Sequence, residues 1–118
     1  METVPSKLES AIRHGRVVSG MTFNQKAWAL CARVPKGKIT TYAEIAQAIG
    51  SPRASRAVGN AMNRNPYAPG VPCHRVVGSN GSLTGYAGGL SKKEKMLAAE
   101  GVAVKGGKVT VSSNLFRF

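Results

Sequence analysis

The spacing of apolar residues predicts two helices in the first half of the chain. After Thr22, a favourable N-cap residue, apolar side chains recur every three or four positions until the segment 35–37, whose proline and glycine end the helix. A second helix is expected after Thr41, because Thr41 and Glu44 form a capping-box pattern. Gly50 suits the left-handed C-cap that would end it. The apolar faces are predicted at Phe23, Ala27, Leu30, Cys31 and Val34 in the first helix, and at Tyr42, Ile45, Ala46 and Ile49 in the second.

A third predicted helix follows at once and has two different faces. Ser51 is expected to be its N-cap and Pro52 its first residue. An apolar stripe consists of Ala54, Ala57, Val58, Ala61 and Met62, and the opposite face carries Arg53, Arg56, Asn60 and Asn63, with the small residues Ser55 and Gly59 between them. Two helices joined by a short turn, the second with small, basic and amide residues, are typical of a helix-turn-helix. A plain helical hairpin with a solvated polar face has the same pattern.

The second half of the chain predicts shorter elements between irregular segments. Residues 65–72 are rich in proline and residues 78–89 in glycine, so both are expected to be loops. A second capping-box pattern, at Ser91 and Glu94, predicts a helix that ends near Glu100.

Strands are predicted in three places. A short strand is expected at residues 38–40, and the segment 72–77 runs toward another. Valines alternate on both sides of Gly106 and Gly107, which predicts a β-hairpin with a glycine turn. With the helices, these strands indicate an α+β fold: a small winged-helix-like domain with a helix-turn-helix and a C-terminal β-hairpin.

The length of 118 residues is enough for one domain. We expect it to span residues 22–118 and to follow an N-terminal arm, residues 1–21. A hydrophobic content of 42% and a mean hydropathy of -0.14 are typical of a soluble globular chain. No apolar stretch approaches the roughly 18 residues of a membrane span, and the N-terminal region has no apolar core of a secretory signal. These features predict a cytoplasmic or nuclear protein that is not secreted.

The charge balance narrows the class of partner. The chain has 17 lysine and arginine residues against 5 glutamates and no aspartate, a formal net charge of +12 at pH 7. Between Glu44 and Glu94 it carries several basic residues and no acid. This favours a polyanionic partner, above all nucleic acid, although a basic surface that serves only solubility has the same composition. The 2 cysteines and 2 histidines fit neither a disulfide framework nor a four-ligand zinc site, so we expect no metal and no cofactor.

The sequence Pro72-Cys73-His74-Arg75 is the sharpest candidate for chemistry. A cysteine reacts as the thiolate and therefore needs a lowered pKa. Pro72 suits a helical first turn, whose free N–H groups favour an anion, and Arg75 would add positive potential. In a regular strand His74 would point away from Cys73, so a contact between them needs a one-turn helix or a bridging water. The alternative is a buried structural cysteine beside a surface His-Arg pair. Cys31, on an apolar helix face, is expected in the core.

Three motifs together resemble the DNA-binding domain of the O6-alkylguanine-DNA alkyltransferases. They are RAVGNAMNRNP at residues 56–66, PCHRVV at residues 72–77 and YAGGL at residues 86–90. The resemblance covers residues 23–102 and includes the family's spacing between the motifs. Such proteins bind DNA in the minor groove through a helix-turn-helix, flip the damaged nucleotide and transfer its alkyl group to their own cysteine without turnover. The resemblance therefore implies a monomer that acts on double-stranded DNA with O6-alkylguanine, and with O4-alkylthymine as a further candidate substrate.

The resemblance also implies roles for the reacting side chains. Cys73 would accept the alkyl group, and His74, through a water, and Glu100 would activate it. Tyr42 would rotate the 3′ phosphate, contact the base and help to protonate the leaving oxygen. Arg56 would fill the space left by the flipped nucleotide, next to the other DNA-binding candidates Arg53, Ala57, Gly59 and Asn60.

The remaining implied roles concern the pocket for the flipped base. Asn65 would be the hinge that ties the helix-turn-helix to the active-site loop. The carbonyls of Cys73 and Val76 would accept from the guanine amine, and Tyr86 with the backbone of Ala87 and Gly88 would close over the base. Met62 and Arg75 complete this set of hinge and pocket residues.

Two departures from the family pattern bear on function. Familiar members carry a larger N-terminal domain, some with zinc, whereas this match begins at residue 23, and Ala87 stands where many relatives have serine. Alkyltransferase-like proteins, which bind O6-alkylguanine without repair, are also short but replace the cysteine that is Cys73 here. A damage sensor that marks lesions for another pathway is thus the alternative to repair. A plain winged-helix regulator would not need the Cys73 motif, and a cysteine hydrolase would lack the third member of its triad.

Overall fold

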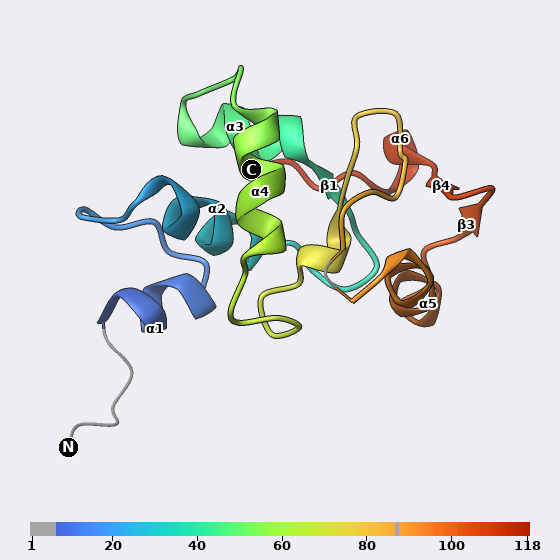
Figure 1. Ribbon diagram of the computed structural model, residues 1–118, viewed down its shortest axis with the longest axis horizontal. Coiled ribbons are helices and arrows are strands. Elements are labelled where there is room, and N and C mark those ends of the chain that lie inside the picture. Colours follow the sequence, from blue (N-terminus) through green and yellow to red (C-terminus); the bar gives the residue numbers. More distant parts are fainter. Residues whose placement is uncertain (1–6, 87) are drawn as a thin grey trace.

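Helices dominate the computed structural model, which describes residues 7–86 and 88–118 (Figure 1). The strands are short and pair in two sheets: β1 and β2 run parallel, and β3 and β4 run antiparallel. In chain order the elements are α1 (Lys7–Arg13), α2 (Phe23–Cys31), β1 (Thr40–Thr41), α3 (Tyr42–Ile49), α4 (Ser55–Asn63), the 3₁₀ turn η1 (Cys73–Arg75), β2 (Val76–Val77), α5 (Leu90–Ala99), β3 (Val104–Lys105), β4 (Lys108–Val109) and α6 (Val111–Asn114). Among the described residues, no helix combines the length and the apolar character needed to cross a membrane.

The first two predicted helices are present and begin at the predicted N-caps, but α2 ends at Cys31, before the stop expected at residues 35–37, and only the Thr41 half of the second capping box forms. The Thr22 side chain accepts a hydrogen bond from the N–H of Gln25, and the Gln25 side chain accepts one from the N–H of Thr22, which completes a capping box. Thr41 accepts from the N–H of Glu44 at the start of α3. Gly50 ends α3 with φ 95°, a conformation that favours glycine.

The prediction that Ser51 caps the third helix was wrong, because Ser51 belongs to the end of α3. Its N–H donates to the carbonyl of Ala46 at 2.9 Å, which closes α3 beyond the left-handed Gly50. Pro52 lies in the turn that follows, and α4 begins at Ser55. The turn between the two helices is thus longer than expected, and Arg53 lies in it rather than on the helix.

The apolar stripe predicted for α4 is confirmed at three positions. Val58, Ala61 and Met62 are buried in the core. Ala57 is exposed, so its assignment to the stripe was wrong. The helix begins three residues later than predicted, and Ala57 lies beside Arg56 on the outward face, where the resemblance had also placed it as a DNA-binding candidate.

The C-terminal part contains the predicted helix and hairpin with different limits. Gly89, with φ 96°, is the N-cap of α5 and no side chain caps this helix, so the capping box predicted at Ser91 is absent. The β3–β4 hairpin turns at Gly106 and Gly107, both with positive φ, as predicted. It spans only residues 104–109, because the chain continues from β4 into α6.

Two buried clusters form the core, and the candidate site lies between them. The larger cluster joins residues of α1 to α4 with Cys73 and Val76, and the smaller one consists of Ile39, Val77, Leu83, Leu97, Val102 and Val109. In Figure 1, α1 to α4 occupy one half of the molecule, α5 and the hairpin the other, and the yellow segment that contains η1 runs between them. Val76 and Val77, which are neighbours in β2, thus belong to different clusters.

The predicted N-terminal arm contains α1, which packs against α2. Ala11 and Ile12 are buried in the same cluster as α2, α3 and α4. The boundary expected at residue 22 therefore does not coincide with a break in the hydrophobic core.

Candidate active site and nucleic-acid interface

Cys73 begins η1, a one-turn helix of the kind that the sequence analysis gave, beside a bridging water, as a way for Cys73 and His74 to act together. The proline-rich loop delivers the chain to Pro72, and the N–H of Val76 bonds back to the carbonyl of Cys73. The Cys73 residue is 6% exposed, so its sulfur is held in the protein but can be reached from a neighbouring pocket. Cys31 is fully buried, which confirms that it belongs to the core.

His74, Arg75 and Glu100 form one hydrogen-bonded cluster behind Cys73. The Nε2 atom of His74 lies 3.0 Å from Glu100 Oε2, and Arg75 donates from Nε and Nη2 to the two carboxylate oxygens, each at 2.8 Å. Arg75 also donates to the carbonyl of Val34 at 2.7 Å. Glu100 is the C-cap of α5, where a carboxylate is unfavourable with the helix dipole, and these partners explain its presence there.

The pKa values of the acid and of the imidazole in this cluster are both lowered, but for different reasons. The hydrogen bonds from Arg75 lower the pKa of Glu100 to about 2, with His74 adding to the effect against the opposing cost of burial. Burial lowers the pKa of His74, against the influence of Glu100, so the imidazole is neutral near pH 7. Because a carboxylate only accepts, Nε2 carries the hydrogen and Nδ1 is an acceptor. Nδ1 is buried and has no hydrogen-bond partner among the described residues.

The electrostatics of Cys73 differ from those expected from the sequence. Burial raises the pKa of the Cys73 thiol, although a hydrogen bond with Asn65 and the charge of Lys93 act to lower it. The expected cation, Arg75, is engaged with Glu100 and Val34, and the charge that acts on Cys73 is that of Lys93. The sequence had predicted a net lowering of this pKa, but it could not show how strongly the thiol is buried.

Lys93 is a functional candidate that the sequence reading missed. It is fully buried on α5, and its Nζ donates to the carbonyls of Val76 at 2.7 Å and Thr84 at 2.8 Å. Burial lowers its pKa to about 8, so Lys93 is charged near neutral pH. Lys93 precedes buried Leu97 by four residues, and this spacing was the available signal, because it places Lys93 on the inward face of the helix.

Tyr42 is tied to Lys93 through a shared acceptor. The Tyr42 hydroxyl donates to the carbonyl of Thr84 at 3.0 Å, and the Lys93 Nζ lies 5.9 Å from the centre of the Tyr42 ring. Burial raises the pKa of Tyr42. The phenol is therefore protonated at neutral pH and can donate a hydrogen bond.

Asn65 joins the end of α4 to the loop that carries Cys73. Its Nδ2 donates to the carbonyl of Val71 and its Oδ1 accepts from the N–H of Tyr67, both at 2.9 Å. The Tyr67 ring packs edge-on against Trp28, and Arg13 of α1 lies 4.8 Å from its centre. The loop before Cys73 is thus held from two sides, by α4 and by α1 with α2.

A pocket of about 210 Å³, here called the Cys73 pocket, brings together most of the residues expected around a flipped base. Tyr86 donates from its hydroxyl to the sulfur of Met96, and Gly88 lies against the Tyr86 ring, where a Cβ atom would come within 2.9 Å of it. The expected contact at Ala87 lies outside the described residues. The lining consists of Met62, Asn65, Ala68, Pro69, Cys73, Tyr86, Gly88, Lys92 and Met96.

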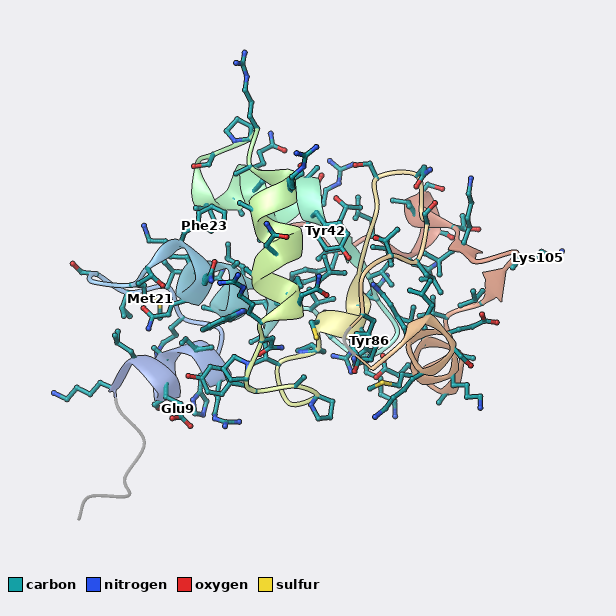
Figure 2. The ribbon with its side chains drawn as sticks, in the orientation of Figure 1. Glu9, Met21, Phe23, Tyr42, Tyr86 and Lys105 are labelled. Carbon is teal, nitrogen blue, oxygen red and sulfur yellow. The ribbon has the colours of Figure 1, made fainter. Side chains whose placement is uncertain are left out.

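A second concavity of about 440 Å³, here called the α4 hollow, contains the residues expected to contact DNA. Figure 2 shows Tyr42 beside the middle of α4, and a Cβ atom on Gly59 would lie 4.0 Å from the Tyr42 ring. Arg53 and Ala57 are exposed but do not line this space. The lining consists of Tyr42, Ala43, Ser55, Arg56, Gly59, Asn60, Asn63, Ser79, Thr84 and Gly85.

Within the described residues, 7–86 and 88–118, no group of three or more His, Cys, Asp or Glu side chains is placed to hold a metal ion. The groups that the site offers for chemistry are the Cys73 thiol, the His74–Glu100 pair, the Tyr42 phenol and the buried Lys93 ammonium.

Comparisons with known proteins identify relatives of this chain. Residues 22–102 match the model of a family described as 6-O-methylguanine DNA methyltransferase, DNA binding domain. A methylated-DNA–protein-cysteine methyltransferase of Methanosarcina acetivorans is 56% identical over 82 residues, which are 70% of this chain and 53% of that protein. The chain thus spans about half the length of such curated relatives.

Two solved structures are also similar in fold. S. pombe Atl1, in complex with damaged DNA containing O6-carboxymethylguanine, has a TM-score of 0.73 and 30% identity, and the match covers 81% of this chain and 95% of that one. Mycobacterium tuberculosis OGT, in complex with DNA, has a TM-score of 0.67 and 41% identity, and the match covers 78% of this chain and 61% of that one. The predicted α+β fold with its helix-turn-helix agrees with both.

Proposed function

This chain belongs to the 6-O-methylguanine DNA methyltransferase family through its DNA-binding domain, and on that premise we propose that it repairs DNA by moving an alkyl group from O6-alkylguanine to Cys73. The reaction is a single transfer with no turnover. Its partner is double-stranded DNA, and the protein therefore acts in a compartment that holds DNA.

The observation that carries this proposal is that α4 lines both concavities. Arg56 and Asn60 face the α4 hollow, whereas Met62, in the last turn of the same helix, and Asn65, just beyond its end, line the Cys73 pocket. An O6-alkyl group cannot be reached inside a duplex, so the nucleotide must leave the stack. A duplex bound against α4 would have a flipped base next to the pocket that contains the thiol.

In the proposed reaction the thiol loses its proton to the cluster behind it. His74 is neutral with a free acceptor at Nδ1, and Glu100 stabilises the imidazolium that forms. A water can carry the proton from Cys73 to Nδ1. The sulfur then attacks the alkyl carbon, a carbon–sulfur bond forms, and the carbon–oxygen bond to O6 breaks with its electron pair on the oxygen.

The leaving guanine needs a proton, and Tyr42 is the proposed donor. Its raised pKa keeps the phenol protonated, and its hydrogen bond with Thr84 directs it toward the loop that borders the pocket. Lys93 favours the thiolate by its charge and fixes the Val76 carbonyl, which is proposed to accept from the guanine amine. That carbonyl has a second lone pair for the base.

On the DNA side, we assign Arg56 to the space left by the flipped nucleotide. Arg56 and Asn60 are exposed and make no hydrogen bond or ion pair within the described part of the chain, so both are free to contact DNA. Arg53, Ala57 and Gly59 are proposed to lie along the same groove. Small residues there let the helix approach the duplex closely.

A damage sensor is the second candidate, and one observation favours it. The likeness to Atl1 covers nearly all of that chain, whereas the likeness to OGT covers 61% of its own. This chain, however, has a cysteine in the pocket at position 73, with an imidazole–carboxylate pair behind it. The two functions differ in one measurable event, the formation of a thioether.

The test is the intact mass of the protein after mixing with a duplex that contains O6-methylguanine. We expect a gain of one methyl group per chain, located on Cys73 and not on Cys31, because a thioether is far more inert than an acyl-enzyme. Cys73→Ser should abolish transfer and retain DNA binding, and Cys31→Ala serves as the matched cysteine control. Tight binding to the lesion without a mass gain would establish the damage sensor instead, and repeated turnover would contradict both.

A further inference from the structure

The Cys73 pocket has an asymmetric distribution of charge. Its described lining is apolar at Met62, Pro69 and Met96 and carries polar groups at Asn65 and Tyr86. Lys92 is the one charged residue of this described lining, and no acid contributes to it. Glu100 is the acid of the cluster behind Cys73, and its negative charge is compensated by Arg75, which donates to both carboxylate oxygens.

Lys92 lines the pocket, and its stem lies beside Gly88. A Cβ atom on Gly88 would lie 3.1 Å from the Cδ atom of Lys92 and 2.9 Å from the Tyr86 ring, so the lysine stem lies along the glycine beside the tyrosine. Lys92 is exposed, and its ammonium group makes no hydrogen bond or ion pair within the described part of the chain. The charge of Lys92 is therefore available to a group in the pocket.

A positive charge in the pocket lining matters for this chemistry because the nucleophile is an anion. A negatively charged alkyl group would repel the thiolate and would enter a partly buried site at an electrostatic cost. Lys92 in the pocket lining, together with the charge of Lys93 that acts on Cys73, offsets both effects for an anionic adduct. A methyl group carries no charge and gains nothing from Lys92.

We propose that Lys92 makes the site selective for O6-adducts that carry a carboxylate, of which carboxymethyl is the smallest. The proposal rests on the proposed function and specifies its substrate class. The sulfur attacks the methylene carbon, the carbon–sulfur bond forms as the bond to O6 breaks, O6 takes the electron pair and a proton, and Cys73 becomes S-carboxymethylcysteine. The carboxylate is adjacent to the attacked carbon and therefore lies inside the pocket during transfer.

The experiment compares two duplexes that differ only in the charge of the adduct. One contains O6-carboxymethylguanine and the other its neutral isostere, O6-carbamoylmethylguanine. Single-turnover rates are measured for the wild type, Lys92→Gln, Lys92→Glu and the control Lys95→Gln, which changes an exposed lysine of α5 outside the pocket. The intrinsic reactivities of the two adducts cancel when the carboxymethyl-to-carbamoylmethyl ratio is compared between proteins.

We expect this ratio to fall about fivefold in Lys92→Gln, as for the loss of one solvent-accessible ion pair, and further in Lys92→Glu. Methyl transfer should slow no more than carbamoylmethyl transfer does in the same Lys92 variant, and the ratio in Lys95→Gln should equal that of the wild type. Equal slowing of both adducts would show that Lys92 contacts a phosphate instead, and an unchanged ratio would also overturn the proposal.

A failure of the proposed function has a different signature. If the wild type transfers none of the groups, the affinities of Cys73→Ser for the two duplexes still report the subsite. Tighter binding of the carboxymethyl duplex that disappears in Cys73→Ser/Lys92→Gln would support the anion subsite without repair. Equal affinities would reject it.

Discussion

The Cys73 pocket and the α4 hollow share a helix but are built in opposite ways. Behind the pocket, the polar side chains of His74, Glu100 and Lys93 are tied to protein partners at 2.7 to 3.0 Å. In the hollow, Arg56 and Asn60 have no such partners within residues 7–86 and 88–118. Groups that perform bond chemistry must be held in position before the substrate arrives, whereas groups that bind a polyanion can be ordered by it.

The difference extends to charge. Near Cys73, the opposite charges of Arg75 and Glu100 compensate each other. Lys93 has no such counter-charge, and two backbone carbonyls stabilise its ammonium group. The cations at the hollow and around it are solvated and uncompensated. Substitutions behind the pocket should therefore affect every substrate, and substitutions of Arg56 or Asn60 in the hollow should affect only a substrate embedded in duplex DNA.

The largest effect is expected from Glu100→Ala, which leaves Arg75 and His74 without their shared acceptor. Breaking such a partly buried pair costs about 3 kcal/mol, so urea unfolding should shift markedly to lower denaturant. Transfer from both duplex and free base should fall together. The exposed Glu94→Ala on the same helix is the control and should change stability by less than about 0.5 kcal/mol.

The pH dependence of stability sharpens the same prediction. Because the pKa of Glu100 is lowered from 4.5 to about 2, its stabilisation is present above about pH 4.5 and is lost as the pH falls toward 2. In Glu100→Ala this acid-dependent loss should shrink. An acid limb identical to that of the wild type would mean that the cluster contributes nothing to stability.

A smaller and selective effect is expected from Arg56→Ala. DNA binding should stay within about tenfold of the wild type, because one of many phosphate-facing cations is lost. Repair in duplex should slow by about 10- to 100-fold, since extruding a base costs a few kcal/mol, while reaction with the free base should not change. The control is Arg64→Ala, an exposed arginine of the same region outside the hollow. Equal slowing on duplex and free base would remove the distinction between the two regions.

The smallest effect is expected from Lys93→Met, and it depends on pH. Lys93 is charged below its pKa of about 8 and lowers the pKa of the Cys73 thiol, so its removal should raise the apparent pKa of transfer. A shift of about one unit would slow transfer about tenfold at pH 7. The two rates should converge at high pH, where the thiol is ionised in both proteins. Lys95→Met is the matched control, and a loss independent of pH would indicate a purely structural role.

The sequence predicted the helices best where the chain itself supplies their ends. Thr22, Thr41 and Gly50 form their capping hydrogen bonds with residues no more than five positions away, so a short stretch of sequence is enough to predict these helix ends. Ser51 was misassigned because two helix ends compete for it, and only the geometry of Gly50 decides that it closes α3. The prediction of an N-cap at Ser91 was wrong for a similar reason, because the N-cap of α5 is Gly89, two residues earlier.

The sequence by itself determined the reactive cysteine motif, the helix pair and the positive charge, because each is a local pattern or a sum over residues. Only the tertiary structure decided which cation acts on the thiol: the sequence pointed to Arg75, which is engaged by Glu100, whereas the charge that lowers the pKa of Cys73 is that of Lys93 on α5. Burial, too, belongs to the fold: it raises the pKa of Cys73, lowers that of His74 and keeps Lys93 between two carbonyls. These effects depend on distance and desolvation, which are fixed only when segments far apart in the sequence pack together.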